Sequence, residues 1–336
     1  MRSLSALIIL VSLATGCAGF REKPDPPHHY YDLADNFVTL NDPALYAKPI
    51  KVRFKEAGSG PVLFLVHGLQ TSSYSWRYNI EELGKKHHVI AMDLVGSGLT
   101  DHPADFGYSP EHVADFLEAF RAELAKRDPS FEKIDLVGNS LGGAYSAVYA
   151  AKHPERLRKL VIIHAPAFIE SAPFFGLEQM RKGRVPEFVA TIAFGEWMVR
   201  DYLIYYRPNL ISEEEVAEYA RPYQDGEGRR AFWHIVREGL APEVSDRLTP
   251  VIATIKTPTL LIWAEKDSLI APWTGHRWNA TLPGSKLVWI PESSHFPHVE
   301  APAMTMGYIE EFIGSGTGST STNAVSAAAS NPDSAK

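Results

Sequence analysis

A serine set between small residues is the first group in this sequence that could do chemistry. The segment Gly138–Gly143 reads Gly-Asn-Ser-Leu-Gly-Gly, and it directly follows the apolar run Ile134–Val137. A Gly-x-Ser-x-Gly motif between a strand and a helix is typical of a nucleophile elbow, a strained turn that exposes the serine hydroxyl above a sheet. Only very small neighbours fit beside such a turn, which accounts for Gly138 and Gly142. We therefore predict that Ser140 is a nucleophile.

A serine hydroxyl is a poor nucleophile at neutral pH and needs a general base. His295 lies in a loop that follows the apolar run Leu287–Ile290, and small residues precede it. His298 lies in the same loop and is the alternative, but it is further from the end of the predicted strand. We therefore predict that His295 is the base.

The acid that orients this base is expected where the preceding strand ends. The apolar run Thr259–Trp263 is followed by two carboxylates, Glu265 and Asp267. We prefer Asp267, because the stretch Asp267–Pro272 leads into the next predicted helix, and Glu265 is the alternative. The acid would hold the imidazole in one tautomer and stabilise the imidazolium without accepting the proton.

Alternating short and long segments must bring these three residues together. Six short runs rich in β-branched residues are predicted to be buried parallel strands: Val62–Val66, Val89–Met92, Ile134–Val137, Leu160–Ile163, Thr259–Trp263 and Leu287–Ile290. Helices are predicted between or after them: Tyr74–Lys86, Glu111–Arg127, Ala144–Lys152, Pro272–Thr281 and Ala301–Ile313. This alternation predicts an α/β protein with a mostly parallel sheet and helices on both faces. Phe37–Leu40 and Val52–Phe54 are candidates for an antiparallel edge.

One long segment breaks the alternation. Residues 168–250 are rich in aromatic side chains and contain prolines that would separate short helices. We interpret this segment as a helical cap inserted into a core made of residues 33–167 and 251–314. Most of its aromatic residues would fill the core of the cap, and a few would line a pocket for an apolar ligand.

Five motifs together resemble the α/β-hydrolase family over nearly all of residues 52–313. They are Val66–Leu69, Asp93–Asp101, Gly138–Gly143, Trp263–Asp267 and Ser294–Glu300. The sequence departs from the family at Val95, where the family usually has Pro, and at Ala264, where it often has Gly. The resemblance implies an α/β-hydrolase fold with the triad order Ser, acid, His.

The resemblance also implies an oxyanion hole made of two backbone N–H groups, those of Leu69 and Leu141, with His67 as a structural brace of its loop. Such donors stabilise the charge that develops when a serine attacks a carbonyl. We expect a serine hydrolase, most simply a carboxylesterase for apolar acyl or aryl esters. Ser140 argues against haloalkane dehalogenases and epoxide hydrolases of this fold, which use Asp as nucleophile.

The same triad also serves C–C bond cleavage of diketones, lactone opening, peptidase action on N-terminal proline and cofactor-free perhydrolysis, and the sequence leaves these alternatives open. A non-catalytic binding scaffold is the alternative from another class. We expect no cofactor. We also expect no metal, because the histidine pairs His28-His29 and His87-His88 are adjacent residues that would face opposite sides of a strand, and no His-Glu-x-x-His motif is present.

The N-terminal residues predict export and lipid attachment. Met1–Gly16 begins with a positive charge, continues with about ten mostly apolar residues and ends with small ones, as secretory signals do. The run Leu13–Cys17 resembles the lipobox of bacterial lipoproteins, although Ala14 holds the place where the strictest motif has Leu. The resemblance implies that Cys17, the only cysteine, is lipidated with chains such as palmitate, and that Ala18 directs the protein to the outer membrane, facing the periplasm.

The remaining segments and the charge complete the expectation. Residues 17–32 are rich in proline and charge and are predicted to be a linker. Residues 315–336 are mostly Ser, Thr, Gly, Ala and Asn and are predicted to be a disordered tail. A formal net charge of −7 without a basic run argues against a nucleic-acid partner.

Overall fold

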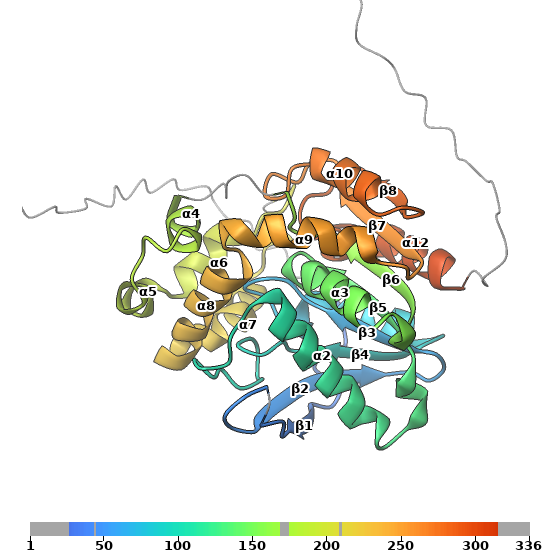
Figure 1. Ribbon diagram of the computed structural model, residues 1–336, viewed down its shortest axis with the longest axis horizontal. Helices are drawn as coiled ribbons and strands as arrows, with labels where there is room; N and C mark the ends of the chain where they lie inside the picture. Colours follow the sequence, from blue (N-terminus) through green and yellow to red (C-terminus); the bar gives the residue numbers. More distant parts are fainter. Residues whose placement is uncertain (1–26, 44, 169–174, 208–209, 315–336) are drawn as a thin grey trace, which may run out of the picture.

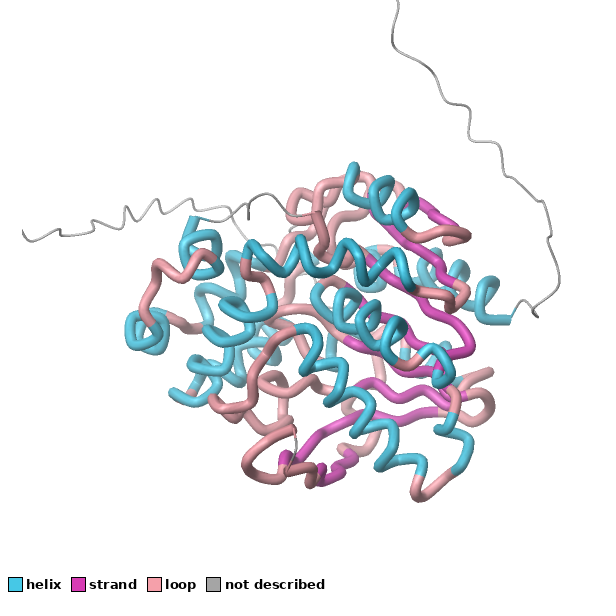
Figure 2. The backbone as a smooth tube through the Cα atoms, in the orientation of Figure 1, coloured by secondary structure: helices cyan, strands magenta, loops and turns pink. Residues whose placement is uncertain are grey.

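A computed structural model describes residues 27–43, 45–168, 175–207 and 210–314. Eight strands in these ranges form one twisted sheet in the order β1-β2-β4-β3-β5-β6-β7-β8 (Figures 1 and 2). The strands are β1 Asn36–Leu40, β2 Ile50–Ala57, β3 Val62–Val66, β4 His88–Met92, β5 Ile134–Asn139, β6 Leu157–Ile163, β7 Thr259–Ala264 and β8 Lys286–Ile290. Strands β3 to β8 run parallel, whereas β1 and β2 pair antiparallel at one edge. The expected mostly parallel sheet with an antiparallel edge is confirmed.

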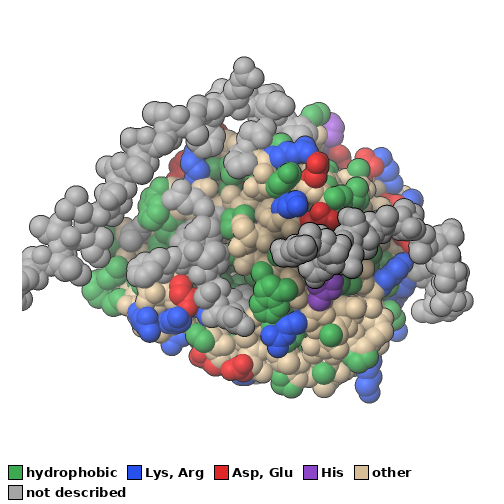
Figure 3. Space-filling model, turned by 90° about the horizontal axis from the view of Figure 1, so that it is seen from above, with side chains coloured by type: hydrophobic (Ala, Val, Ile, Leu, Met, Phe, Trp, Pro, Cys, Tyr) green, Lys and Arg blue, Asp and Glu red, His purple; other side chains and the backbone are tan. Residues whose placement is uncertain are grey.

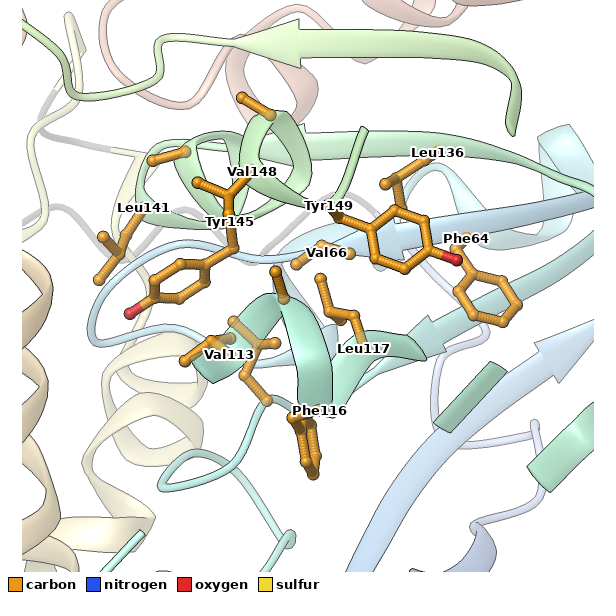
Figure 4. Close-up of a cluster of buried hydrophobic side chains, with 14 of the residues drawn as sticks. Phe64, Val66, Val113, Phe116, Leu117, Leu136, Leu141, Tyr145, Val148 and Tyr149 are labelled. Atoms are coloured by element: carbon orange, nitrogen blue, oxygen red, sulfur yellow. The ribbon is translucent and has the colours of Figure 1, made fainter. Parts of the chain in front are cut away.

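Both faces of this sheet are buried, which explains why its strands are apolar throughout. Successive side chains of a strand point to opposite faces, so β3 sends Phe64 to one core and Leu63 and Leu65 to the other. The first core lies under α2 (Pro110–Ala125) and α3 (Leu141–Lys152). Figure 4 shows side chains of these two helices interleaved over residues of β3 and β5. The second core lies under α1 (Ile80–Gly84) and α12 (Pro302–Gly314) and continues into the inserted helices.

The predicted helix at residues 74–86 is the clearest difference from expectation. It is two pieces, the 3-10 helix η1 (Ser73–Trp76) and α1, with a short break between them. The hydroxyl of Ser72 caps η1, and the backbone N–H groups of Arg77 and Asn79 bond three residues back rather than four. These tighter turns bury Trp76 completely before α1 begins.

In the described residues, six α-helices lie between β6 and β7, in the segment that the sequence predicts to interrupt the sheet. They are α4 Phe175–Arg181, α5 Glu187–Ala193, α6 Glu196–Tyr202, α7 Glu213–Ala220, α8 Gly226–Gly239 and α9 Pro242–Thr254. Helices α4 to α8 gather at one end of the sheet in Figure 1, and we call them the cap. Helix α9 instead packs against α3 and α10 (Trp273–Thr281), so it covers the sheet domain. The exact limits of the cap at residues 168–250 stay a prediction, with residues 169–174 outside the described ranges.

The end of the predicted linker is part of the folded domain. Tyr30 is buried, and its hydroxyl lies 2.8 Å from Ser73 Oγ and accepts a hydrogen bond from Arg53. Tyr31 donates a hydrogen bond of 3.1 Å to Glu218 of α7. The expectation of a spacer reaching residue 32 is therefore wrong for these residues. The burial of an aromatic ring against the core is more favourable than leaving that ring in solvent, so these tyrosines pack onto the domain.

The outside of the molecule carries charge of both signs. On the face shown in Figure 3, Lys and Arg side chains are interspersed with Asp and Glu and with single hydrophobic residues. Among the described helices, we find none that combines the length and the hydrophobicity needed to cross a bilayer. The predicted lipidation site Cys17 and the predicted tail lie outside the described residues.

Candidate active site

Ser140 stands at the junction of β5 and α3, at the apex of a strained turn. Its backbone has φ of +53° and ψ of −126°, a region that residues with a Cβ rarely occupy. The Ser140 N–H donates to the carbonyl of Ile163 at 2.7 Å, and the Ser140 carbonyl accepts from Gly143 at 2.8 Å. A Cβ on Gly138 would lie 2.5 Å from the carbonyl oxygen of Gly142, so the glycine spacing is what lets the turn close. This geometry is that of a nucleophile elbow.

The predicted base and acid are in direct contact. Nδ1 of His295 lies 2.8 Å from Oδ2 of Asp267, and both side chains are almost fully buried. The two residues come from loops that follow β8 and β7, which are neighbours in the sheet. Backbone bonds join these loops, because the N–H of Glu265 donates to Ile290 and that of Lys266 donates to Ser293.

Asp267 is held as a carboxylate by a set of donors. Its Oδ1 accepts backbone hydrogen bonds from Leu269 at 2.7 Å and from Ile270 at 3.0 Å. Burial alone would raise the pKa of Asp267, but the neighbouring imidazoles of His295 and His164 hold that pKa well below its usual range. The side chain is therefore a fixed anion, as an orienting acid requires.

The histidine loop is tied to the elbow next to Ser140. The side-chain amide of Asn139 donates to the backbone carbonyl of His295 at 3.3 Å. On the other side of the loop, the carboxylate of Glu300 accepts from the Ser294 N–H at 2.7 Å. The structure thus brings the loops of Ser140, His295 and Asp267 to the same edge of the sheet, where β5, β7 and β8 end.

The two alternative residues lie elsewhere. Glu265 is exposed, and its backbone rather than its side chain contributes to the loop. His298 is fully buried and packs against Trp76, with ring centroids 4.2 Å apart and the ring planes tilted by 33°. Burial holds the pKa of His298 well below its ordinary value, so this ring is a neutral part of the core.

The loop that carries Leu69, one of the two predicted oxyanion donors, is held in place by the side chain of His67. His67 is buried, its Nε2 accepts the N–H of Leu94 at 2.9 Å, and its Nδ1 lies 2.8 Å from the carbonyl of Gly68. A Cβ on Gly68 would lie 2.8 Å from the Ser140 Cβ, so this loop passes directly beside the elbow. Leu141 is the first residue of α3, where a backbone N–H has no acceptor within its own helix. The backbone N–H groups of Leu69 and Leu141 stay the predicted oxyanion donors.

A small pocket lies beside these two leucines. Leu69 and Leu141 line it together with Val95 and Tyr145 of the sheet domain, and Tyr223 and Ile235 of the segment 221–239 close it from the cap side. Figure 4 shows Leu141 and Tyr145 next to each other on α3, at one end of the hydrophobic cluster. The lining is mostly apolar, and the pocket as it stands is narrow.

His164 is a site residue that no sequence motif identifies. It follows β6, is completely buried, and its Nδ1 lies 2.8 Å from the same Asp267 oxygen that binds His295. Its Nε2 accepts the N–H of Ala264 at 2.7 Å. Its position directly after a buried strand is the one signal that could have found it, because Ser140 and Asp267 follow neighbouring strands in the same way.

Three of these side chains also form a group that could be tested as a metal site. The ligand atoms of His164, Asp267 and His295 lie within 4.8 Å of one another. Two ligands of one tetrahedral zinc ion lie about 3.3 Å apart, given metal–nitrogen bonds of about 2.0–2.1 Å. The Asp267 oxygen is only 2.8 Å from each imidazole nitrogen, a distance that fits hydrogen bonding and leaves no room for a shared ion.

A mostly parallel eight-stranded sheet with a strained serine turn after β5 defines the α/β-hydrolase fold. The chain belongs to the alpha/beta hydrolase family, whose sequence model matches residues 63–305. The uncharacterised hydrolase YugF of Bacillus subtilis is 28% identical over 263 residues, covering 75% of this chain and 89% of that protein. Lipase 1 of Psychrobacter immobilis is 26% identical over 254 residues, covering 75% of this chain and 77% of that protein.

A solved structure of similar fold is the meta-cleavage product hydrolase from Pseudomonas fluorescens IP01. It superposes with a TM-score of 0.66 at 22% identity, covering 84% of this chain and 98% of that one. The family establishes that this chain is a hydrolase of the α/β fold, with lipase-like and meta-cleavage hydrolase neighbours.

Proposed function

We propose that the protein is a serine carboxylesterase that cleaves apolar acyl or aryl esters through Ser140, His295 and Asp267. The observation that carries the proposal is the buried contact of 2.8 Å between His295 and Asp267, on loops tied to the elbow that presents Ser140. An imidazole oriented by a buried carboxylate is the arrangement that a general base requires.

The steps follow from the roles proposed for these groups. Nδ1–H of His295 donates to Asp267, which leaves Nε2 free to take the proton of the Ser140 hydroxyl during attack on the ester carbonyl. The backbone N–H groups of Leu69 and Leu141 stabilise the oxyanion, and each such donor contributes about 3–4 kcal/mol to the transition state. The alcohol leaves with the proton from His295, and water then attacks the acyl-enzyme through the same base.

The pocket beside Leu69 and Leu141 supports an apolar substrate. Its mostly apolar lining, which includes Tyr145 and Tyr223, favours an apolar acyl or aryl group. The sequence similarity to a lipase supports an ester as the substrate. The fold shared with a meta-cleavage product hydrolase leaves C–C bond cleavage as the alternative. A panel of p-nitrophenyl esters of increasing chain length, assayed beside a ring-cleavage diketone, distinguishes the two.

The Ser140→Ala variant tests the nucleophile. We expect it to lose at least about 10³-fold in kcat on a short-chain p-nitrophenyl ester and to lose labelling by a fluorophosphonate probe, with unchanged thermal unfolding. Ser146→Ala is the matched control, because Ser146 is a buried serine on the same helix whose hydroxyl bonds back to the Gly142 carbonyl. Retained turnover in Ser140→Ala would refute the assignment, and a folded wild-type chain that resists the probe would favour the non-catalytic scaffold.

We also propose that the protein is a lipoprotein of the bacterial cell envelope. The support is the sequence alone: a secretory-type segment at Met1–Gly16 and the lipobox-like run that ends at Cys17. Several acyl chains on Cys17 would anchor the protein firmly, since each buried methylene contributes about 0.8 kcal/mol. With Ala18 after the cysteine, the outer membrane facing the periplasm is the proposed location.

A further inference from the structure

The second imidazole on Asp267 has a defined protonation state. The N–H of Ala264 can only donate, and it lies 2.7 Å from Nε2 of His164, so this nitrogen is an acceptor. Burial lowers the pKa of His164, which keeps the ring neutral, and a neutral ring with a bare Nε2 carries its hydrogen on Nδ1. That hydrogen is on the nitrogen that lies 2.8 Å from Asp267 Oδ2.

Asp267 is the available partner for this hydrogen. The ring N–H is directed off the line to Oδ2, so the contact has hydrogen-bond distance without full alignment. In the part of the chain that the structure describes, no other acceptor meets Nδ1 of His164. Catalytic hydrogen bonds are often poorly aligned before substrate binds and tighten in the complex.

The backbone at His164 is also unusual. Its φ is +49°, a left-handed conformation that is costly for a residue with a β-carbon. Its ring lies 5.6 Å from that of His295, between centroids, and it is completely buried beside Trp263. A strained backbone that turns a polar ring toward a catalytic carboxylate is a feature expected of a functional position.

We propose that His164 is a positioning residue that acts through Asp267. Its Nδ1–H donates to Oδ2 of Asp267, the oxygen that also accepts from His295, and this keeps the carboxylate in place. The second donor weakens the attraction between Asp267 and the imidazolium of His295, so that the acid orients the base without raising the pKa of the base too far. The inference rests on the proposed function, in which Asp267 and His295 serve Ser140.

The physical consequence is a shift in the pH dependence of the base. A donor on Oδ2 draws electron density from the oxygen that also faces His295. Without that donor, the carboxylate attracts the positively charged imidazolium more strongly, and the base stays protonated to higher pH. The acid limb of the kcat/KM profile should therefore move to higher pH when the Nδ1 donor is removed.

Few other titratable groups face this cluster. His298 is buried close enough to interact with both His164 and His295, and it is held neutral by burial. Glu300 binds the backbone of Ser294, one residue before His295, and burial raises its pKa. Neither changes in the variants below, so a shift of the profile reports on position 164.

Two amide substitutions separate the two nitrogens of the ring. In His164→Asn the side-chain amide ends where Nδ1 lies, so it can keep the donor to Asp267, and asparagine tolerates a positive φ. In His164→Gln the amide reaches the place of Nε2, so it can keep the acceptor for Ala264 while the Nδ1 position becomes a carbon. Both variants remove the ring, which makes each the control of the other.

We expect His164→Asn to keep the wild-type midpoint of the acid limb. We expect His164→Gln to move it upward by about one pH unit, the size of one lost hydrogen bond to a charged group, so that kcat/KM is about tenfold lower at pH values well below both midpoints and equal to wild type on the plateau. The measurement is kcat/KM of the full chain on a short-chain p-nitrophenyl ester between pH 5 and 9, with thermal unfolding followed in parallel.

A purely structural role gives a different outcome. In that case both variants lower the unfolding temperature and kcat while the midpoint stays in place, and the inference is overturned. Failure of the proposed function is separate, because a wild-type chain that neither turns over the ester nor reacts with a fluorophosphonate fails before position 164 is tested.

A measurement on the wild-type chain guards against variants that do not fold. Histidine-selective ¹⁵N labelling reports the ring tautomer through the chemical shifts of the two ring nitrogens, and the signal lost in His164→Asn identifies His164. We expect a neutral ring with hydrogen on Nδ1 across the pH range of activity. An Nε2–H tautomer, or a charged ring at pH 7, would overturn the inference.

Discussion

Asp267 serves two imidazoles through one oxygen, and its other oxygen is occupied by backbone donors. An asparagine at this position keeps the shape but would present a donor where His295 needs an acceptor. The imidazole would then turn to the wrong tautomer. We expect Asp267→Asn to lower kcat by about 10⁴-fold on a chromogenic ester, measured at steady state.

Glu265→Gln is the control for this substitution, because it removes the neighbouring carboxylate of the same loop. We expect its kcat to stay within about twofold of wild type, since the Glu265 side chain is exposed. A large loss in Glu265→Gln with a small loss in Asp267→Asn would move the role of acid to Glu265.

Among single residues, the sequence identifies those that directly follow a predicted strand, because that position places them at the edge of the sheet where the strands end. Asp267 and His295 follow two apolar runs, and the structure places their side chains 2.8 Å apart. Their catalytic roles stay predictions. The sequence did not identify His164, because a single histidine after a strand belongs to no motif with a recognisable spacing. Its partner, Asp267, is about 100 residues away in sequence. Only the sheet order makes β6 and β7 neighbours.

At the scale of elements, one buried ion pair joins the cap to the sheet domain. Arg77, just after η1, lies 3.0 Å from Glu215 of α7, and both side chains are fully buried. The hydroxyl of Tyr205 donates to the same carboxylate at 2.6 Å. Burial would lower the pKa of Arg77, but Glu215 holds it well above the ordinary value, so the pair stays charged.

Breaking this pair on one side should be far more costly than removing both partners. We expect Glu215→Leu to lower the free energy of unfolding by about 3–5 kcal/mol, because it leaves a buried guanidinium without its counter-ion. The double variant Arg77→Leu/Glu215→Leu should recover most of that loss. Equilibrium denaturation in urea measures both.

The matched control is an ion pair on the surface. Arg207 and Glu292 lie 3.0 Å apart with more than half of each side chain exposed. We expect Glu292→Gln to change the free energy of unfolding by no more than about 1 kcal/mol. If Glu215→Leu changes the free energy of unfolding as little as Glu292→Gln does, the buried ion pair does not stabilise the contact between the cap and the sheet domain.

The elements also show which patterns are readable from sequence. Buried parallel strands were predicted because they are short, apolar and β-branched, and the structure confirms the sheet. The predicted helix at 74–86 was wrong because its periodicity does not reveal the two 3-10-type bonds that end η1 early. Helix α9 has the same amphipathic character as the cap helices, and only its contacts with α3 assign it to the sheet domain.

For the whole molecule, the proposed anchor would place the cap near the membrane. The described chain begins beside the cap, where His28 lies 3.6 Å from Glu214 of α7. Cys17 precedes Pro27 by ten residues, which span at most about 35 Å when fully extended. A lipid on Cys17 would therefore hold the cap, and the pocket beneath it, within reach of the lipid surface.

Lipidation can be tested by expressing the full chain in a bacterium with two membranes and supplying an alkyne-bearing fatty acid. We expect the wild-type chain to take up the label and to appear in the membrane fraction. We expect Cys17→Ser to take up no label and to leave that fraction, because the chain has no other cysteine. An unlabelled wild-type chain would refute the anchor while leaving the esterase proposal untouched.

The residue after the cysteine then tests the destination. If Ala18 permits transfer to the outer membrane, Ala18→Asp should shift the labelled protein to the inner-membrane band of a sucrose gradient, while Ala18→Ser leaves it in the outer-membrane band. Ala18 is not a residue of the proposed active site, so both variants should keep the ester activity of wild type in detergent. Equal distribution of all three chains would show that another part of the sequence decides the membrane, because the attached lipid is the same in each.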